Sequence, residues 1–283
     1  MDPTPSKDRP HVIQCSTGPF WAFELEHAMD CLAEAGFESM ELMVTRDPST
    51  QEPDLPLRLA SERGLRIGSV HGPFLVISKT VWGINSMDKV KRGVELCRAL
   101  GASTYVVHPP YLWEREFARW IKYESAEYSA EHGVTVAVET MYPKWTAGRR
   151  LRMYRWLRPD ELLAGAPHVV LDTSHLALCR EDILGALKML MPKLVHVHLS
   201  DNAGDGRDGH LELEQGILPV DRFLSELRRQ GYAGDVSLEL SVRKYIERPE
   251  ALVSMLRRNR VYVEDRLSKD GRVQKGLPRE ARG

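Results

Sequence analysis

Short apolar segments rich in β-branched residues alternate with amphipathic segments along most of the chain. Such apolar runs are typical of strands that are buried on both faces of a parallel sheet. We therefore predict eight strands, at residues 12–15, 40–44, 67–71, 104–108, 135–139, 169–172, 194–199 and 236–240. The segments between them predict eight helices, near residues 23–35, 54–63, 87–99, 114–132, 159–165, 181–190, 219–230 and 249–265.

Glycines follow several of the predicted helices, at positions where a left-handed C-cap is favourable. They are Gly36, Gly64, Gly101, Gly133 and Gly231. Strands and helices in strict alternation predict an α/β protein that forms a single (β/α)8 TIM barrel. An open doubly wound sheet is the alternative. It would place a glycine-rich phosphate loop after the first strand, and the sequence STGP at residues 16–19 lacks that pattern.

No linker interrupts residues 11–265, which we interpret as one domain, whereas residues 1–10 and 266–283 are expected to be flexible termini. The chain has 283 residues and a formal net charge of −1, so its overall field does not attract nucleic acid. Its four cysteines are far apart, which suits reduced thiols. The sequence shows neither a signal peptide nor a membrane-spanning run, and we expect a cytoplasmic protein.

Side chains of metal-ligand type end six successive predicted strands. They are His71, His108, Glu139, Asp172, His198 and Glu239. In a (β/α)8 barrel the C-terminal strand ends form the catalytic face, and gathering these groups unpaired in an apolar barrel mouth would be costly. Because side chains alternate along a strand, His196 and His198 share a face, with His198 nearer the mouth. The sequence therefore predicts a metal site at this end of the barrel.

Further ligand types follow in the loops after these strands. His175 lies three residues after Asp172, and Asp208 and His210 form an Asp-x-His pair. Imidazole and carboxylate ligands together suit Zn²⁺, Mn²⁺, Fe²⁺ or Co²⁺ better than Ca²⁺ or Mg²⁺. We expect a first ion at Glu139, Asp172, His198 and Glu239. We expect a second or third ion, or substrate contacts, at His71, His108, His175, Asp208 and His210.

Several neighbouring polar residues have simpler interpretations. We expect Glu41 to cap the helix after the second strand, His196 to be a packed core residue, and Asp201 to orient His198. Residues 144–158 are basic and aromatic, and Arg149 and Arg150 are candidates for holding a substrate phosphate. The alternatives for this stretch are a base-stacking surface and a solvated helix face.

Seven segments, in this order, resemble the xylose isomerase-like TIM-barrel superfamily, which includes sugar isomerases and epimerases and endonuclease IV-type DNA repair enzymes. The segments are SVHGPF, VVHPP, VAVET, LDTSHLAL, HVHLSDN, DGHLELEQGILPV and SLEL, and they cover nearly all of residues 11–255. The resemblance implies a metal site at Glu139, Asp172, His198 and Glu239. In the endonuclease branch it implies a trinuclear zinc site that adds His71, His108, His175, Asp208 and His210.

Two features depart from these relatives. The endonuclease branch follows its fifth-strand glutamate with a short polar segment containing glycine, whereas this chain has MYPKWTAGRRLRMYRWLR. Many epimerases hold substrate with an arginine in the loop after the seventh strand, and Arg207 lies near that position. Arg207 is therefore a third candidate for substrate binding.

Three functions fit this site. The favoured one is a divalent-metal-dependent isomerase or epimerase of a sugar, sugar phosphate or polyol, in which an ion stabilises an enediolate and Glu139 and Glu239 transfer the proton. The alternative is an endonuclease IV-type phosphodiesterase, in which up to three zinc ions generate a hydroxide. The net charge disfavours a nucleic-acid substrate for it. A metal-binding barrel without catalysis is the third, and the complete set of ligands argues against it. The oligomeric state stays open.

Overall fold

The computed structural model describes residues 12–73, 81–146 and 149–268 of the chain. Eight parallel strands close into a barrel in the order β1–β10–β9–β8–β5–β4–β3–β2. Their bounds are β1 (Ile13–Ser16), β2 (Ser39–Met43), β3 (Arg66–His71), β4 (Thr104–Val107), β5 (Thr135–Glu139), β8 (Val169–Asp172), β9 (Leu194–Leu199) and β10 (Asp235–Leu238). The predicted (β/α)8 barrel is confirmed.

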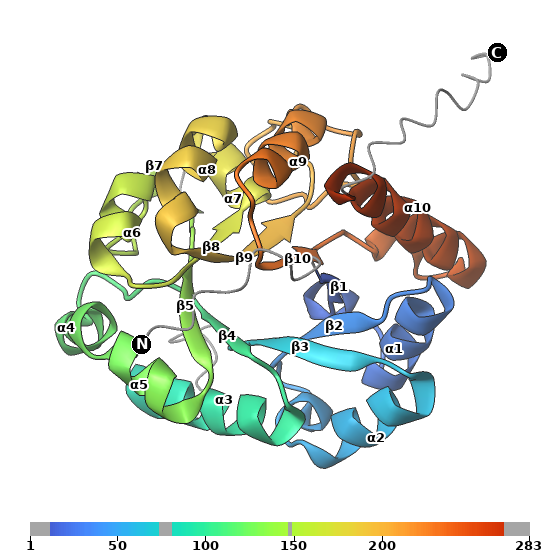
Figure 1. Ribbon diagram of the computed structural model, residues 1–283, viewed down its shortest axis with the longest axis horizontal. Coiled ribbons are helices and arrows are strands. Elements are labelled where there is room, and N and C mark those ends of the chain that lie inside the picture. Colours follow the sequence, from blue (N-terminus) through green and yellow to red (C-terminus); the bar gives the residue numbers. More distant parts are fainter. Residues whose placement is uncertain (1–11, 74–80, 147–148, 269–283) are drawn as a thin grey trace.

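Helices form a ring around the strands (Figure 1). They are α1 (Leu25–Glu34), α2 (Asp54–Arg63), α3 (Ser86–Leu100), α4 (Arg115–Tyr123), α5 (Ser125–His132), α6 (Pro159–Gly165), α7 (Thr173–Cys179), α8 (Ile183–Leu190), α9 (Val220–Arg229) and α10 (Pro249–Leu267). Helix α10 packs against both α1 and α9 and so closes the ring. The glycines predicted to follow helices have positive φ angles, a conformation that favours glycine.

The helix predicted at residues 114–132 is two helices, α4 and α5. The chain turns at Glu124, whose φ is −123°. At the start of α5, Ser125 Oγ donates a hydrogen bond to the carbonyl oxygen of Ile121 at 2.5 Å. Serine hydroxyls that bond to the preceding turn in this way often bend helices. The apolar periodicity of the two helices is nearly in phase, so the sequence pattern did not reveal the break.

The described residues of the basic and aromatic stretch after β5 form no helix. The stretch begins with an antiparallel hairpin of β6 (Lys144–Thr146) and β7 (Arg149–Leu151). The interpretation of residues 144–158 as a solvated helix face is therefore wrong. Tyrosine, tryptophan and threonine in this stretch favour a strand, which is the signal that should have been preferred.

The ends of the chain lie mostly outside the described residues. The expected flexible N-terminus, residues 1–10, is not described, and α10 continues to Leu267, two residues beyond the expected end of the domain. The four cysteines are free thiols, as expected. No described helix is both long enough and apolar enough to span a membrane.

The barrel strands separate two different kinds of core. Between strands and helices lies a large cluster of buried valine, leucine and other apolar residues. Inside the barrel, a small apolar cluster is formed by Val106, Ala137 and Val170. The other buried inward positions are polar: Gln14, Ser39, Glu41, Ser69, His196 and Ser237. The candidate metal ligands lie at the strand ends above this polar interior.

Candidate metal centre

Four predicted ligands converge at the C-terminal end of the barrel. They come from the ends of neighbouring strands β5, β8, β9 and β10: Glu139, Asp172, His198 and Glu239. One ligand atom from each lies within 4.8 Å of the others. His198 Nδ1 is 2.7 Å from Glu139 Oε1 and 3.3 Å from Glu239 Oε2. This spacing allows the four groups to share one ion.

The chemistry of this group fits a divalent cation. Asp172 Oδ2 is buried and accepts no hydrogen bond from the described residues. A buried carboxylate oxygen that accepts no hydrogen bond is costly, and a neighbouring cation would remove that cost. Three carboxylates with one imidazole suit Zn²⁺, Mn²⁺, Fe²⁺ or Co²⁺.

A carboxylate one layer deeper holds the far side of the His198 ring. Glu41 in β2 is fully buried, and its Oε1 lies 3.2 Å from His198 Nε2. Its Oε2 accepts a hydrogen bond from Ser69 Oγ at 2.8 Å and lies 3.0 Å from Nε2 of the buried His196. Glu41 therefore orients His198, and the prediction that it caps a helix is wrong. The sequence did contain a signal for this role, because Glu41 lies inside a predicted strand and on its inward face.

Asp201 organises the loop after β9. Its carboxylate oxygens accept hydrogen bonds from backbone amides of this loop at 2.8, 2.8 and 3.0 Å: Asn202, Gly216 and Leu218. With both oxygens engaged in this way, Asp201 shapes the loop and does not orient His198, contrary to our expectation. The loop in turn carries Asp208 and His210 to the site.

Two further histidines face the second oxygen of Glu139. His71 Nε2 and His108 Nε2 lie 3.5 and 3.2 Å from Glu139 Oε2. His71 Nδ1 lies 2.8 Å from the carbonyl oxygen of Gly72, so this nitrogen carries the proton of the neutral ring. The Nε2 lone pair then points at a carboxylate, which is favourable only with a proton or a cation between them. Histidines that bind metals commonly donate their other ring nitrogen to a carbonyl in this way.

His175 has the same arrangement. Its Nδ1 is 2.8 Å from the carbonyl oxygen of Thr140, and its Nε2 is 3.3 Å from Asp208 Oδ2. Asp208 Oδ1 is 3.2 Å from His210 Nε2. His210 has a φ of 42°, and such backbone strain in a residue other than glycine often occurs at functional sites. Together with Asp172, these two histidines form a further donor group within 4.8 Å.

The proximity of these charges shifts several pKa values. Burial raises the pKa of Asp172 to about 6. Burial would also raise the pKa of Glu139, but the charges of His175 and His198 hold it well below its usual range. Burial lowers the pKa of His210, but the charges of Glu239, Asp208 and Asp172 and a hydrogen bond to Asp208 together outweigh burial and raise this pKa to about 9. Cations that bind here therefore compete with protons, as is general for metal sites.

A cavity of about 400 Å³ opens over these ligands. Glu139 and Glu239 line it, together with residues that the sequence did not single out. Tyr142 packs against His175, with ring centroids 4.8 Å apart. Arg243, at the start of the 3₁₀ helix η4 (Arg243–Tyr245), is the only lysine or arginine among the described lining residues. Its position just after the last barrel strand is the one signal that could have identified it.

The three arginines predicted to bind substrate do not line this cavity. Arg150 in the hairpin donates a hydrogen bond to the carbonyl oxygen of Leu178. Arg207 is 86% exposed in its side chain, and its Nε lies 3.9 Å from Asp205 Oδ2. Arg149 is exposed in β7. Substrate binding by these three arginines stays a prediction.

Comparison with known proteins identifies the family. A family model described as a xylose isomerase-like TIM barrel matches residues 29–260. The chain belongs to this family. An uncharacterised protein of Mycobacterium leprae (strain TN) is 34% identical over 273 residues, covering 89% of this chain and 97% of that protein. An uncharacterised protein of Mycobacterium tuberculosis (strain ATCC 25618 / H37Rv) is 32% identical over 277 residues, covering 90% and 99%.

Solved structures of low sequence identity share the xylose isomerase-like fold. A D-psicose 3-epimerase from Clostridium cellulolyticum H10 has a TM-score of 0.69 at 14% identity, covering 90% of this chain and 99% of that one. A D-tagatose 3-epimerase-like protein has a TM-score of 0.65 at 20% identity, covering 91% and 100%. A family 2 AP endonuclease from Brucella melitensis has a TM-score of 0.62 at 19% identity, covering 85% and 99%. The fold is therefore common to proteins described as sugar epimerases and as an AP endonuclease.

Proposed function

We propose that this member of the xylose isomerase-like family is a divalent-metal-dependent isomerase or epimerase of a sugar, sugar phosphate or related polyol. One observation carries the proposal. Glu139 and Glu239 belong to the same donor group and line the same cavity. A substrate in that cavity therefore meets two carboxylates that reach it from different strands.

The ion would be held by Glu139, Asp172, His198 and Glu239. When bound, it supplies Lewis-acid stabilisation of the negative charge that develops on a substrate carbonyl oxygen. The chain itself must then move a proton. One glutamate removes the proton from the carbon beside the carbonyl, and the other returns a proton to the neighbouring carbon or to the opposite face. The low pKa of Glu139 keeps its carboxylate ionised at neutral pH.

The size and polarity of the cavity support a small polar substrate. Its volume of about 400 Å³ lies in the range that is usual for small-molecule sites. Tyr142 and the histidines offer hydrogen bonds to hydroxyl groups, and Arg243 offers a charge to an anionic group. The near-zero net charge of the chain gives no general attraction for nucleic acid.

Hydrogen exchange tests the proposal directly. Protein loaded with Zn²⁺, Mn²⁺, Fe²⁺ or Co²⁺ should exchange a carbon-bound proton with deuterated water, by NMR, for at least one member of a panel of sugars, inositols and their phosphates. Glu139→Gln and Glu239→Gln each keep one ligating oxygen but lose the base. We expect both variants to retain part of the metal and to lose exchange by roughly 10²–10⁴-fold. Exchange with no member of the panel, together with cleavage of an activated phosphodiester, would overturn the proposal.

A second candidate function is an endonuclease IV-type phosphodiester hydrolase. The donor groups around His71 and around His175 favour it, because they provide places for further ions beside the first. Clustered ions would generate a hydroxide nucleophile and neutralise the leaving oxygen, and Glu139 would bridge metals instead of moving protons. Metal content per chain, in protein purified without added metal, separates the two functions. One ion supports the isomerase, and two or three ions support the hydrolase.

A further inference from the structure

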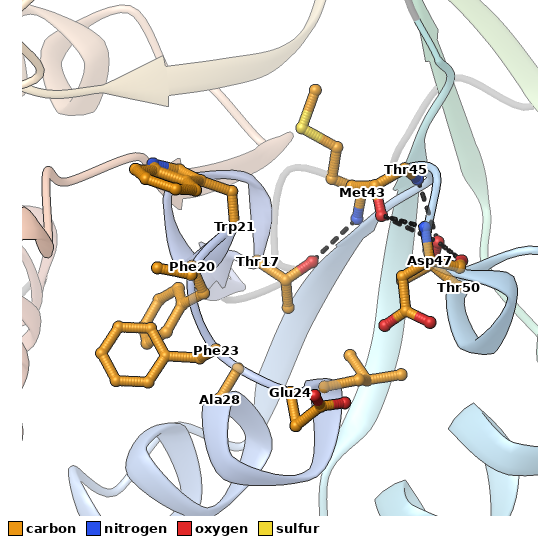
Figure 2. A pocket seen from close by; sticks show the side chains of 12 residues that line it. Thr17, Phe20, Trp21, Phe23, Glu24, Ala28, Met43, Thr45, Asp47 and Thr50 are labelled. Atoms are coloured by element: carbon orange, nitrogen blue, oxygen red, sulfur yellow. Dashed lines mark hydrogen bonds between the residues drawn. The ribbon is translucent and has the colours of Figure 1, made fainter. Parts of the chain in front are cut away.

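Figure 2 shows the residues that line a second cavity, of about 310 Å³. Because it shares lining residues with the metal cavity, it lies at the same end of the barrel. Its walls come from the loop after β1, the start of α1 and the loop after β2. Loops that follow barrel strands carry the substrate contacts in this fold. The proposed proton transfer does not use this cavity, so its lining needs a separate explanation.

The second cavity adjoins the metal cavity. Trp21 and Met43 line both of them. Trp21 is 73% exposed, although its indole is large and apolar. Gly18 lies beside them, and a Cβ at this position would lie 2.6 Å from Met43 Sδ and 3.6 Å from Glu239 Oε1, so a larger residue would crowd the boundary between the two cavities. A ligand that reacts at Glu239 therefore has Trp21 and Met43 between it and the second cavity.

The second cavity has an aromatic side and an oxygen-rich side (Figure 2). Phe20 and Phe23 lie on one side, with ring centroids 5.8 Å apart. Thr45, Asp47 and Thr50 lie on the other side, around the 3₁₀ helix η2 (Pro48–Thr50). This division matches a pyranose ring, which presents C–H groups on its faces and hydroxyl groups at its edge. Small-molecule sites commonly combine apolar walls with a few placed polar groups.

Three polar side chains of the second cavity retain hydrogen-bonding capacity. Glu24, at the N-cap of α1, makes no side-chain capping bond. Asp47 is held by the amide and hydroxyl of Ser49, at 2.9 and 2.6 Å, and each of its oxygens can still accept a second hydrogen bond. Thr17 Oγ1 accepts the amide of Met43 at 2.9 Å and keeps its own proton to donate. The cavity thus offers mostly acceptors, which suits a ligand that carries hydroxyl groups.

The same side chains argue against an anionic occupant. The described residues that line the second cavity include no lysine or arginine. They include two acidic residues, Glu24 and Asp47. A phosphate or carboxylate placed there would meet like charges, which costs free energy. A neutral polyhydroxylated ring meets acceptors and aromatic side chains instead.

We propose that the second cavity is a subsite for a glycosyl unit, so that the substrate is a glycosylated sugar larger than a monosaccharide. The inference rests on the proposed function for the place of the reacting sugar. That sugar lies at Glu139 and Glu239. The attached glycosyl ring passes Trp21 and lies between Phe23 and Asp47.

Calorimetric titration of the metal-loaded protein tests this subsite without requiring turnover. The probes are common disaccharides with α and β linkages, each compared with its two constituent monosaccharides. We expect at least one disaccharide to bind roughly tenfold or more tightly than either constituent, as one charged hydrogen bond or one aromatic contact would give. Equal affinity for disaccharides and monosaccharides throughout the panel would overturn the inference.

Two variants locate the effect in the second cavity. Glu24→Gln keeps the shape but removes the charge, and Trp21→Ala removes the aromatic wall shared by the two cavities. Both side chains are exposed, so we expect both variants to fold. In each variant, the affinity for the disaccharide should exceed that for its constituent monosaccharides by only about twofold or less. We call this ratio of affinities the disaccharide advantage. Glu34→Gln, the same change at the other end of α1, is the matched control and should keep the full advantage. An unchanged advantage in Glu24→Gln and Trp21→Ala would contradict the assignment.

The chemical class is tested with an aryl monosaccharide, a nitrophenyl glycoside. If it binds as tightly as the best disaccharide, and equally in wild type and Glu24→Gln, the cavity is an apolar site and the glycosyl assignment is wrong. Failure of the proposed function has a different signature. Hydrogen exchange would then be absent with every sugar, while the disaccharide advantage and its dependence on Glu24 and Trp21 would persist.

Discussion

The two faces of the barrel strands lie in environments that differ in polarity and in purpose. Outward-facing side chains pack against the helices in one large apolar cluster. Inward-facing side chains are mostly polar, and their apolar part in the described residues is a small cluster of Val106, Ala137 and Val170 with the partly buried Val195 packed against it. Buried apolar area is the main source of folding free energy. The outer layer therefore stabilises the barrel, and the interior is free to carry groups that cost stability.

The polar interior shows this cost directly. Ser39 Oγ, Ser237 Oγ and Gln14 Oε1 are buried and accept or donate no hydrogen bond within the described residues. Each such group opposes folding by about 1–3 kcal/mol. These residues lie beneath the candidate metal ligands, so the comparison teaches that the barrel retains unfavourable polar groups in its interior and not in its outer layer.

Removing a metal ligand should have the largest effect on function. We expect His198→Ala to lose the bound ion and all activity, because one of four donors and its contacts to Glu139 and Glu239 disappear. Metal content by mass spectrometry and hydrogen exchange by NMR measure this. Glu239→Ala should behave in the same way. Unchanged metal stoichiometry in both variants would show that the ion lies elsewhere.

A substitution in the outer apolar layer should lower the stability of the protein and leave its metal binding unchanged. Phe223 in α9 is fully buried in the outer cluster. We expect Phe223→Ala to lower the free energy of unfolding by about 3–5 kcal/mol, measured by urea denaturation, with the metal content of the folded protein unchanged. His198→Ala, compared with metal-free wild type, should cost less stability than this. A larger stability loss in His198→Ala would break the division between the two layers.

Residues in the layer beneath the site should affect the affinity for the ion without binding it directly. Glu41→Gln weakens the contact to His198 Nε2 while leaving the shape of the side chain. We expect the dissociation constant of the ion to rise about 10–100-fold, the usual effect of changing a residue behind a ligand. Competition with a chromophoric chelator measures it, and the exposed Glu38→Gln serves as the control. Complete loss of the ion in Glu41→Gln would make Glu41 a ligand.

Arginine substitutions inside and outside the metal cavity should show which of these side chains binds a substrate phosphate. If Arg149 and Arg150 hold a substrate phosphate, changing both to alanine should raise KM for a phosphorylated substrate several-fold and leave its unphosphorylated analogue nearly unaffected. Arg243→Ala is the comparison, because Arg243 lines the cavity. A phosphate-specific effect in Arg243→Ala alone would assign the anion contact to the loop after β10. An equal effect of the double change on both analogues would remove Arg149 and Arg150 from the substrate site.

The smallest expected effect lies on the exposed surface. Burial opposes ionisation of Glu161, but hydrogen bonds from Arg152 at 3.0 and 2.9 Å and from the amide of Leu157 contribute to a net lowering of its pKa. A lowered pKa in the folded state stabilises the protein above the usual glutamate range, and this stabilisation is lost as the pH falls through the folded value. We expect Glu161→Gln to cost less than about 1 kcal/mol at neutral pH and nothing in acid. Thermal unfolding against pH measures it, with Glu127→Gln as the control. A constant difference across the pH range would contradict the electrostatic origin.

The alternation of strands and helices was readable from the sequence, because apolar runs and C-cap glycines are local signals. The position of the candidate ligands at one end of the barrel was readable for the same reason, since strand parity places one residue of each strand end at the mouth. Neither the break between α4 and α5 nor the hairpin of β6 and β7 followed from periodicity. Both depend on single side-chain bonds or on short strands whose pattern is weak.

The sequence by itself therefore determined the barrel and the chemical type of its mouth. The tertiary structure alone decided which groups face each other. Closure of the barrel brings β2 close enough to β9 for Glu41 to reach His198. The pairing of β1 with β10 and with β2 also places the loops after these strands together, so that Arg243 reaches the metal cavity and Trp21 joins it to a second one. These contacts join residues that are far apart in the chain. Only the closed sheet brings their side chains together, so no local sequence pattern encodes the distances between them.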